Sequence, residues 1–140
     1  MDPDNPIVKI CVQGIQAEAQ GNYDEARAFY TQAWQESTGD YEACIAAHFM
    51  ARHQDDPYVM LYWNQEALRR AESLEDASVD GFYPSLYLNT GFSHERLGEQ
   101  AEALRYYQLA AELVERLAQD AYGETVRQAI AEGIKRASQA

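Results

Sequence analysis

The sequence has little of what builds a disulfide framework, a metal site or a membrane span. Its 140 residues include two cysteines, Cys11 and Cys44, which form no CxxC pair and no other metal-ligand spacing. The longest unbroken apolar run, at residues 58–63, is too short to cross a bilayer. Residues 1–6 lack the basic and apolar segments of a signal peptide. These absences predict a cytoplasmic protein that does not bind membranes and whose two cysteines are small, buried side chains.

Positive charge is also scarce. The chain has 11 lysines and arginines against 23 aspartates and glutamates, which gives a formal net charge of -12. Such a surface repels phosphate groups, so general binding to nucleic acid or to anionic membranes is not expected. The hydrophobic fraction of 46% argues against disorder, and a chain of this length can bury a core of its own. We therefore expect one globular domain with basic or neutral partners.

The common catalytic motifs are missing. The sequence contains no GxxxxGK[ST], GxGxxG, HExxH or GxSxG. His48 and His53 are five residues apart and would point to different sides of a helix, and His94 stands far from both. The sequence thus predicts a protein that is not an enzyme and has no metal or cofactor, although a catalytic site added to a repeat scaffold remains a minor alternative.

The signals for secondary structure are those of helices joined by short turns. Asn5 and Asp56 each precede a proline, which is the pattern of a capping residue followed by the first helical position. Apolar residues recur at intervals of three and four, and no alternating strand pattern competes. The expected fold class is all-α. The predicted helices cover about residues 6–20, 23–38, 41–53, 57–75, 84–97, 100–118 and 122–138.

One pattern occurs twice. Residues 21–34, GNYDEARAFYTQAW, align with residues 98–111, GEQAEALRYYQLAA. The alignment pairs Glu25 with Glu102, Ala26 with Ala103, Tyr30 with Tyr107, Ala33 with Ala110 and, seven residues before each turn glycine, Gly14 with Gly91. Small residues let helix backbones approach closely, and a large aromatic ring can fill the gap between neighbours. The repetition therefore predicts helix pairs that stack to bury a common core.

This pattern resembles the tetratricopeptide repeat, whose period is about 34 residues. The residues that carry the resemblance are Gly14, Gly21, Tyr23, Ala26, Tyr30 and Ala33 in one copy and Gly91, Gly98, Ala103, Tyr107 and Ala110 in another. A middle copy places its turn at Asp55, with Ala67 and Leu68 at second-helix positions and His48 at a small-residue position. The resemblance implies a right-handed α-solenoid with three repeats, at about 7–40, 41–74 and 84–117.

The rest of the chain fits around these repeats as a single domain over residues 1–140. Residues 75–83 form an insertion, where we expect longer helices or a longer loop. Residues 122–138 are predicted to form a capping helix whose outer side is polar. One face of that helix holds Val126, Ile130, Gly133, Ile134 and Ala137. Residues 121–140 have two carboxylates and three cations, a net charge of +1 that could complement the acidic repeats.

The resemblance also implies a binding surface, because the first helices of tetratricopeptide repeats line a concave groove that takes partner peptides. Six apolar residues lie six or ten positions before the three turns, and residues four apart share a helix face. They would form two rows, and an exposed apolar patch of this kind usually marks an interaction site. The candidate groove residues are Cys11, Ile15, Ile45, Phe49, Arg52, Leu88, Asn89 and Phe92.

Three interpretations of these residues remain open. The first is a non-catalytic interaction module that binds a peptide or helix with apolar anchors and basic flanks. The second is a homodimer that closes the same groove on a second copy, and the third is an ordinary core covered by residues 122–138. One subclass is not expected. Family members that clamp the acidic carboxyl tails of chaperones use lysine, arginine and asparagine, whereas the matching positions here are Cys11, Ile15, Ala46, Ser85 and Asn89, of which only Asn89 fits.

Overall fold

The computed structural model describes residues 1–117 and 119–139, and this part of the chain is helical with no strand. The all-α prediction is therefore confirmed. The seven α-helices are α1 (Pro6–Ala19), α2 (Tyr23–Glu36), α3 (Asp40–Met50), α4 (Pro57–Glu72), α5 (Tyr83–Arg96), α6 (Gln100–Glu112) and α7 (Ala121–Ala137). Two short 3-10 helices, η1 (Asp80–Phe82) and η2 (Val114–Arg116), precede α5 and follow α6.

Side-chain caps explain where three of the helices begin. The Asn5 side chain accepts hydrogen bonds from the backbone N–H groups of Ile7 and Val8, at 2.8 and 3.2 Å. The Asp56 carboxylate accepts one from Tyr58 at 2.9 Å, and a proline follows each of these caps. Because proline lacks the N–H that the first turn would leave unpaired, both starts are stable, as the sequence predicts. The Asp120 carboxylate caps α7 by accepting a hydrogen bond from the Gly123 N–H at 2.8 Å.

The helices end earlier than the sequence predicts, and the difference is largest, at three residues or more, for α3, α4 and α6. Helix α3 ends at Met50, where the Gln54 amide donates to the Met50 carbonyl at 2.7 Å, and His53 takes a left-handed backbone conformation with φ of 59°. Helix α6 ends at Glu112 and gives way to η2, so the predicted helix over 100–118 is too long; position 118 lies outside the described residues. The predicted insertion at 75–83 is a loop that contains η1.

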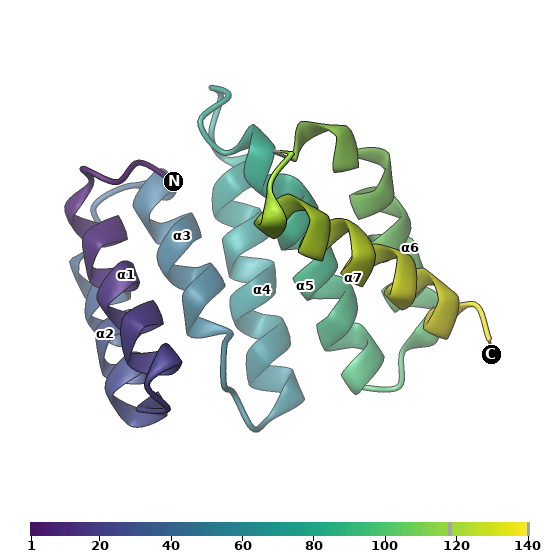
Figure 1. Ribbon diagram of the computed structural model, residues 1–140, viewed down its shortest axis with the longest axis horizontal. Helices are drawn as coiled ribbons and strands as arrows, with labels where there is room; N and C mark the ends of the chain where they lie inside the picture. The colour runs from purple at the N-terminus through teal and green to yellow at the C-terminus, as the bar shows by residue number, and fades with distance from the viewer. Residues whose placement is uncertain (118, 140) are drawn as a thin grey trace. The chain divides into compact units, whose positions relative to one another are not determined.

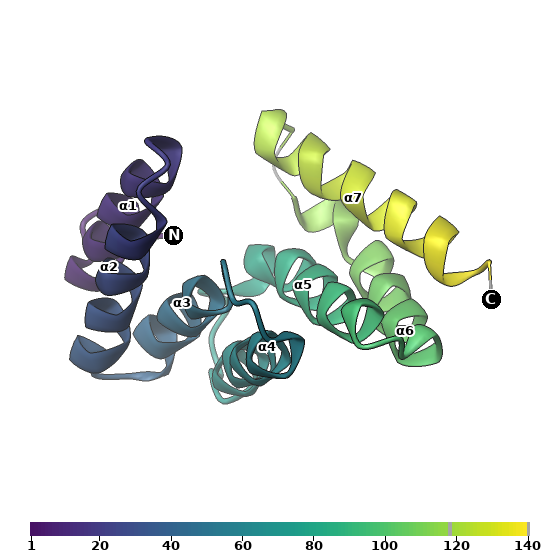
Figure 2. The same cartoon turned by 90° about the horizontal axis from the view of Figure 1, so that it is seen from below.

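The chain divides into two compact units, Met1–Glu75 and Asp76–Ala140, and each is described by itself. In the first unit, α1 packs against α2 and α3, α2 also contacts α3, and α4 packs against α3 (Figure 1). In the second unit, α5 packs against α6, and α7 lies against both of them (Figure 2). Each unit therefore has a helix pair followed by a third helix that packs on the pair.

Helix α7 is amphipathic in the way that the sequence predicts. Val126 and Ile130 are buried and pack with Ala110 of α6 and with Leu117, while Ile134 is half-buried beside them. Gly133 and Ala137 complete the buried face. The other side of α7 carries exposed polar and charged residues, so this helix packs on one side only.

Glycines allow the tyrosine rings to sit between helices. A Cβ atom at Gly91 would lie 2.9 Å from the ring of Tyr107, and one at Gly133 would lie 2.8 Å from the same ring. In the first unit a Cβ at Gly14 would overlap the ring of Tyr30. Both tyrosines are fully buried. The predicted pairing of small residues with a large aromatic ring is confirmed at these contacts.

Candidate functional site

The structure buries three of the eight candidate groove residues. Cys11, Ile45 and Phe49 are in the core, and Phe49 is 4% exposed. The Phe49 ring stacks on Tyr30 with centroids 5.1 Å apart, and the Arg52 guanidinium lies 5.9 Å from its centroid. Burial also raises the pKa of the Cys11 thiol to about 12, so this side chain stays neutral. Their burial removes these three residues from an open groove, and for Cys11 it agrees with the expectation that both cysteines are buried.

The other candidates reach the surface to different extents. Ile15 is 37% exposed and Phe92 is 44% exposed. Leu88 and Asn89 are half-buried, and Leu88 packs against the apolar clusters that α5, α6 and α7 share. Arg52 is exposed just beyond the end of α3. Ile15 and Phe92 are thus the apolar candidates that a partner could contact most directly.

Ile15 and Phe92 occupy the same place in the two units. Each directly follows the glycine that admits a tyrosine ring, Gly14 in α1 and Gly91 in α5. Each also stands one turn before a glutamate that accepts hydrogen bonds from a tyrosine and an arginine elsewhere in its unit. The exposed side chain is therefore attached to a rigidly packed helix position in both units.

In the first unit the glutamate is Glu18. Its carboxylate accepts a hydrogen bond from the Tyr30 hydroxyl at 2.6 Å and two from Arg52, from Nε at 2.9 Å and from Nη2 at 2.6 Å. His53 Nε2 lies 3.0 Å from the same carboxylate. Burial alone would raise the pKa of Glu18, but the hydrogen bonds from Arg52 and Tyr30 outweigh it and the net pKa is lowered. Glu18 therefore stays ionised and links α1, α2 and the segment after α3.

The second unit repeats this arrangement with Glu95. The Tyr107 hydroxyl donates to Glu95 at 2.6 Å, and Arg136 of α7 donates from Nε at 2.8 Å and from Nη2 at 3.1 Å. The bonds from Arg136 lower the pKa of Glu95, burial opposes this, and the bond from Tyr107 adds to it. The sequence analysis missed both glutamates. Extending the alignment of the two copies upstream would have found them, because Glu18 and Glu95 fall at matching positions.

Carboxylates are distributed unevenly over the helices. No aspartate or glutamate on α1, α3 or α5 is exposed, whereas α2, α4, α6 and α7 all carry exposed ones. The four acidic residues of α1, α3 and α5 are half-buried and bonded to other side chains: Glu18 to Arg52, Asp40 to Arg70, Glu42 to Asn5 and Glu95 to Arg136. The exposed carboxylates that make this chain acidic are therefore absent from α1, α3 and α5.

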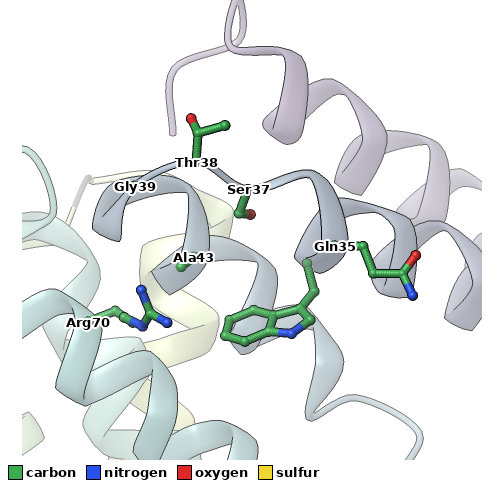
Figure 3. Close-up of a pocket in the computed structure, with 7 residues that line it drawn as sticks. Gln35, Ser37, Thr38, Gly39, Ala43 and Arg70 are labelled. Atoms are coloured by element: carbon green, nitrogen blue, oxygen red, sulfur yellow. The ribbon is translucent and has the colours of Figure 1, made fainter.

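A pocket of about 400 Å³ lies in the first unit, between the end of α2 and the start of α3. Figure 3 shows Arg70 reaching toward this pocket, with Ala43 on its wall and the Gln35 side chain pointing away. The Arg70 guanidinium donates to Asp40 at 3.1 Å and to Glu66 at 3.0 Å. Because its charge is already balanced by two carboxylates, the pocket offers little attraction to an anion.

Among the residues that the structure describes, no group of three histidine, cysteine, aspartate or glutamate side chains is placed to hold a metal ion. None of the described helices has both the length and the apolar composition that crossing a membrane requires. Comparisons with protein-family models, with curated proteins and with solved structures found no match to this chain.

Proposed function

We propose that this chain is a non-catalytic protein-interaction module, built as a tetratricopeptide-like solenoid, whose first helices receive a peptide or helix of a partner protein. The observation that carries the proposal is the pairing of Ile15 and Phe92. Both are exposed apolar side chains at the same position of the two units, on helices without an exposed carboxylate.

Physical chemistry supports such a role for these helices. Contact with an apolar side chain is favourable only where few charged groups must lose water, and α1 and α5 meet that condition. The contact set is smaller than the sequence predicts, because three of its members are buried. We assign partner contact to Ile15, Arg52, Leu88, Asn89 and Phe92. The net charge of -12 attracts a partner with basic flanks over longer distances.

Self-association through the same residues is the alternative function. It would bury Ile15 and Phe92 against a second copy and needs no other partner. However, each copy has a net charge of -12 over the whole chain, and the repulsion between two such chains opposes association. Charge therefore favours a different protein as the partner.

Selection from a displayed library of random peptides tests the proposal. We expect the wild-type chain to enrich peptides with large apolar residues, and the double variant Ile15→Ser/Phe92→Ser to bind these peptides at least about ten-fold more weakly. The matched control is Val59→Ser, which changes a residue of α4 that is as exposed as Ile15, at 37%. Equal binding by the wild-type chain and the double variant, or no enrichment at all, would contradict the proposal.

A further inference from the structure

The first two turns of α4 are apolar on both sides. Met60 faces the core of the first unit and is buried. On the other side, Tyr58 is 72% exposed and Tyr62 is 57% exposed. Because residues four apart share a helix face, these two rings stand one above the other on the surface. Packing in the core of the first unit accounts for the apolar residue on the buried side of α4, but not for the two exposed tyrosines on the other side.

Tyr62 is supported by a row of aromatic rings. Its ring meets Trp63 edge to face with centroids 5.0 Å apart, and Trp63 meets Trp34 of α2 in the same way at 4.9 Å. Trp34 is in turn covered by the Arg70 guanidinium at 5.5 Å. A ring that is held in this way loses little conformational freedom when a ligand binds to it, so it is suited to be a contact residue.

The charge around the tyrosine pair is negative. Asp55 and Asp56 directly precede α4 and both are exposed. Residues 1–75 hold 13 aspartates and glutamates against 5 lysines and arginines.

Along α4 itself the first cation is Arg69, which lies toward the other end of the helix and is paired with Glu66. Before α4, Arg27 donates to the His53 carbonyl and is paired with Asp24. A positively charged ligand is therefore favoured at the start of α4.

We propose that Tyr58 and Tyr62 form a binding site for an arginine-rich segment of another protein. Both cations are attracted by the negative face of an aromatic ring, but a guanidinium group is planar, packs flat on the ring and is more weakly hydrated than a lysine ammonium. The site goes beyond the function proposed above, because its chemistry is cationic and it uses neither Ile15 nor Phe92. A symmetric contact with a second copy of this chain is disfavoured here, since it would set Asp55 and Asp56 against their own counterparts.

The spacing of the two tyrosines specifies the ligand further. Four helical residues rise about 6 Å along the axis. In an extended peptide, side chains two positions apart point the same way and are separated by roughly 6.6 Å. The site is thus matched to the sequence Arg-x-Arg in extended form, with one guanidinium over each ring.

The probe is a fluorescein-labelled peptide, Gly-Ser-Arg-Ser-Arg-Ser-Gly, and its lysine counterpart, titrated into the full chain and followed by anisotropy. We expect the arginine peptide to bind more tightly than the lysine peptide. The variant Tyr58→Ala/Tyr62→Ala should weaken it by at least about five-fold, and Tyr58→Phe/Tyr62→Phe should retain it. The matched control is Tyr23→Ala/Tyr122→Ala, which removes two exposed tyrosines elsewhere and should leave binding unchanged.

Three results would overturn this assignment. Equal affinity for the two peptides, together with no effect of the alanine variant, would mean that only the net charge of the chain attracts them. An equal loss in the control variant would remove any special role for α4. A fall in solution mass for Tyr58→Ala/Tyr62→Ala would assign the surface to a second copy. Far-ultraviolet spectra of all the variants show whether each remains folded.

Discussion

In both units a glutamate accepts hydrogen bonds from a tyrosine and an arginine, but the residue that packs against the tyrosine ring differs. In the first unit Tyr30 and Arg52 hold Glu18, and in the second Tyr107 and Arg136 hold Glu95. Three residues before the arginine, the first unit has Phe49, whose ring stacks on the tyrosine. The second unit has Gly133 there, and the tyrosine ring lies against its backbone. One polar arrangement can thus be combined with either an aromatic or a glycine contact.

The third helices also differ in how much of their surface is buried. Helix α3 is buried over Ala43–Phe49, because it packs on α1 and α2 on one side and on α4 on the other. Helix α7 is buried along one face alone. In its side-chain contacts α7 therefore resembles α3, but the outer face of α7 is polar.

The largest expected effect is the difference in unfolding free energy between Phe49→Ala and Phe92→Ala. Phe49→Ala should lower the free energy of unfolding by about 3 to 5 kcal/mol, because it removes a buried ring that stacks on Tyr30. Phe92→Ala should cost less than about 1 kcal/mol, because its ring is already partly in water. Both tryptophans lie in the first unit, so their fluorescence in urea reports on Phe49→Ala, while circular dichroism follows Phe92→Ala. Equal losses would show that the exposure of the two rings is assigned wrongly.

The glycine contact is tested by Gly133→Ala. Alanine is the better helix former by roughly 0.5 to 1 kcal/mol, so the substitution would stabilise an open helix position. Here the added Cβ meets the Tyr107 ring, and we expect a net loss of about 1 to 3 kcal/mol in urea denaturation. Ala131→Ser, on the exposed side of the same helix, is the control and should change stability by less than about 0.5 kcal/mol. A gain in stability for Gly133→Ala would contradict the packing of α7 on Tyr107.

Removing each tyrosine hydroxyl compares the polar parts of the two units. Tyr107→Phe should cost about 1 to 2 kcal/mol, because a hydrogen bond to a charged carboxylate is lost. Tyr30→Phe should cost less, since Glu18 retains both Arg52 and His53 while Arg136 is the partner that remains with Glu95. Urea midpoints measured side by side check the order. The reverse order would mean that His53 contributes nothing to holding Glu18.

The dependence of stability on pH tests the lowered pKa of Glu95. A carboxyl group whose folded pKa lies below its unfolded value of 4.5 stabilises the fold above that pH, and the stabilisation is lost as the pH falls further. We expect the stability of the wild-type chain to fall on acidification below pH 4.5, and Glu95→Gln to fall less steeply over the same range. The measurement is the urea midpoint by circular dichroism from pH 7 down to the acid transition. Parallel curves would show that Glu95 is not held as an ion.

Much of the fold follows from the sequence. The proline-linked caps at Asn5 and Asp56 place two helix starts correctly, and the paired small residues locate the contacts of Tyr30 and Tyr107. Helix ends are less predictable because they depend on single contacts. Helix α3 stops where Gln54 caps its carbonyl end, which no periodicity indicates.

The candidate site is predicted less well, for a physical reason. Spacing along a helix indicates which side chains share a face, but not what covers that face. Phe49 and Phe92 both lie six residues before a turn. Tyr30 and Arg52 pack against Phe49 and bury it, whereas Phe92 is exposed. Arg52 is a candidate from the sequence, but spacing along one helix does not show that Arg52 pairs with Glu18, 34 residues before it, or that Arg136 pairs with Glu95, 41 residues before it.

The measurement that tests the proposed function most directly is the solution mass of the wild-type chain over a wide range of concentrations, with Phe92→Ser as the comparison. A module that keeps Ile15 and Phe92 open for a different protein should sediment at 15.9 kDa throughout, and the substitution should leave the mass unchanged. A wild-type mass that rises toward twice this value with concentration, and returns to 15.9 kDa in Phe92→Ser, would contradict the account and assign these residues to self-association.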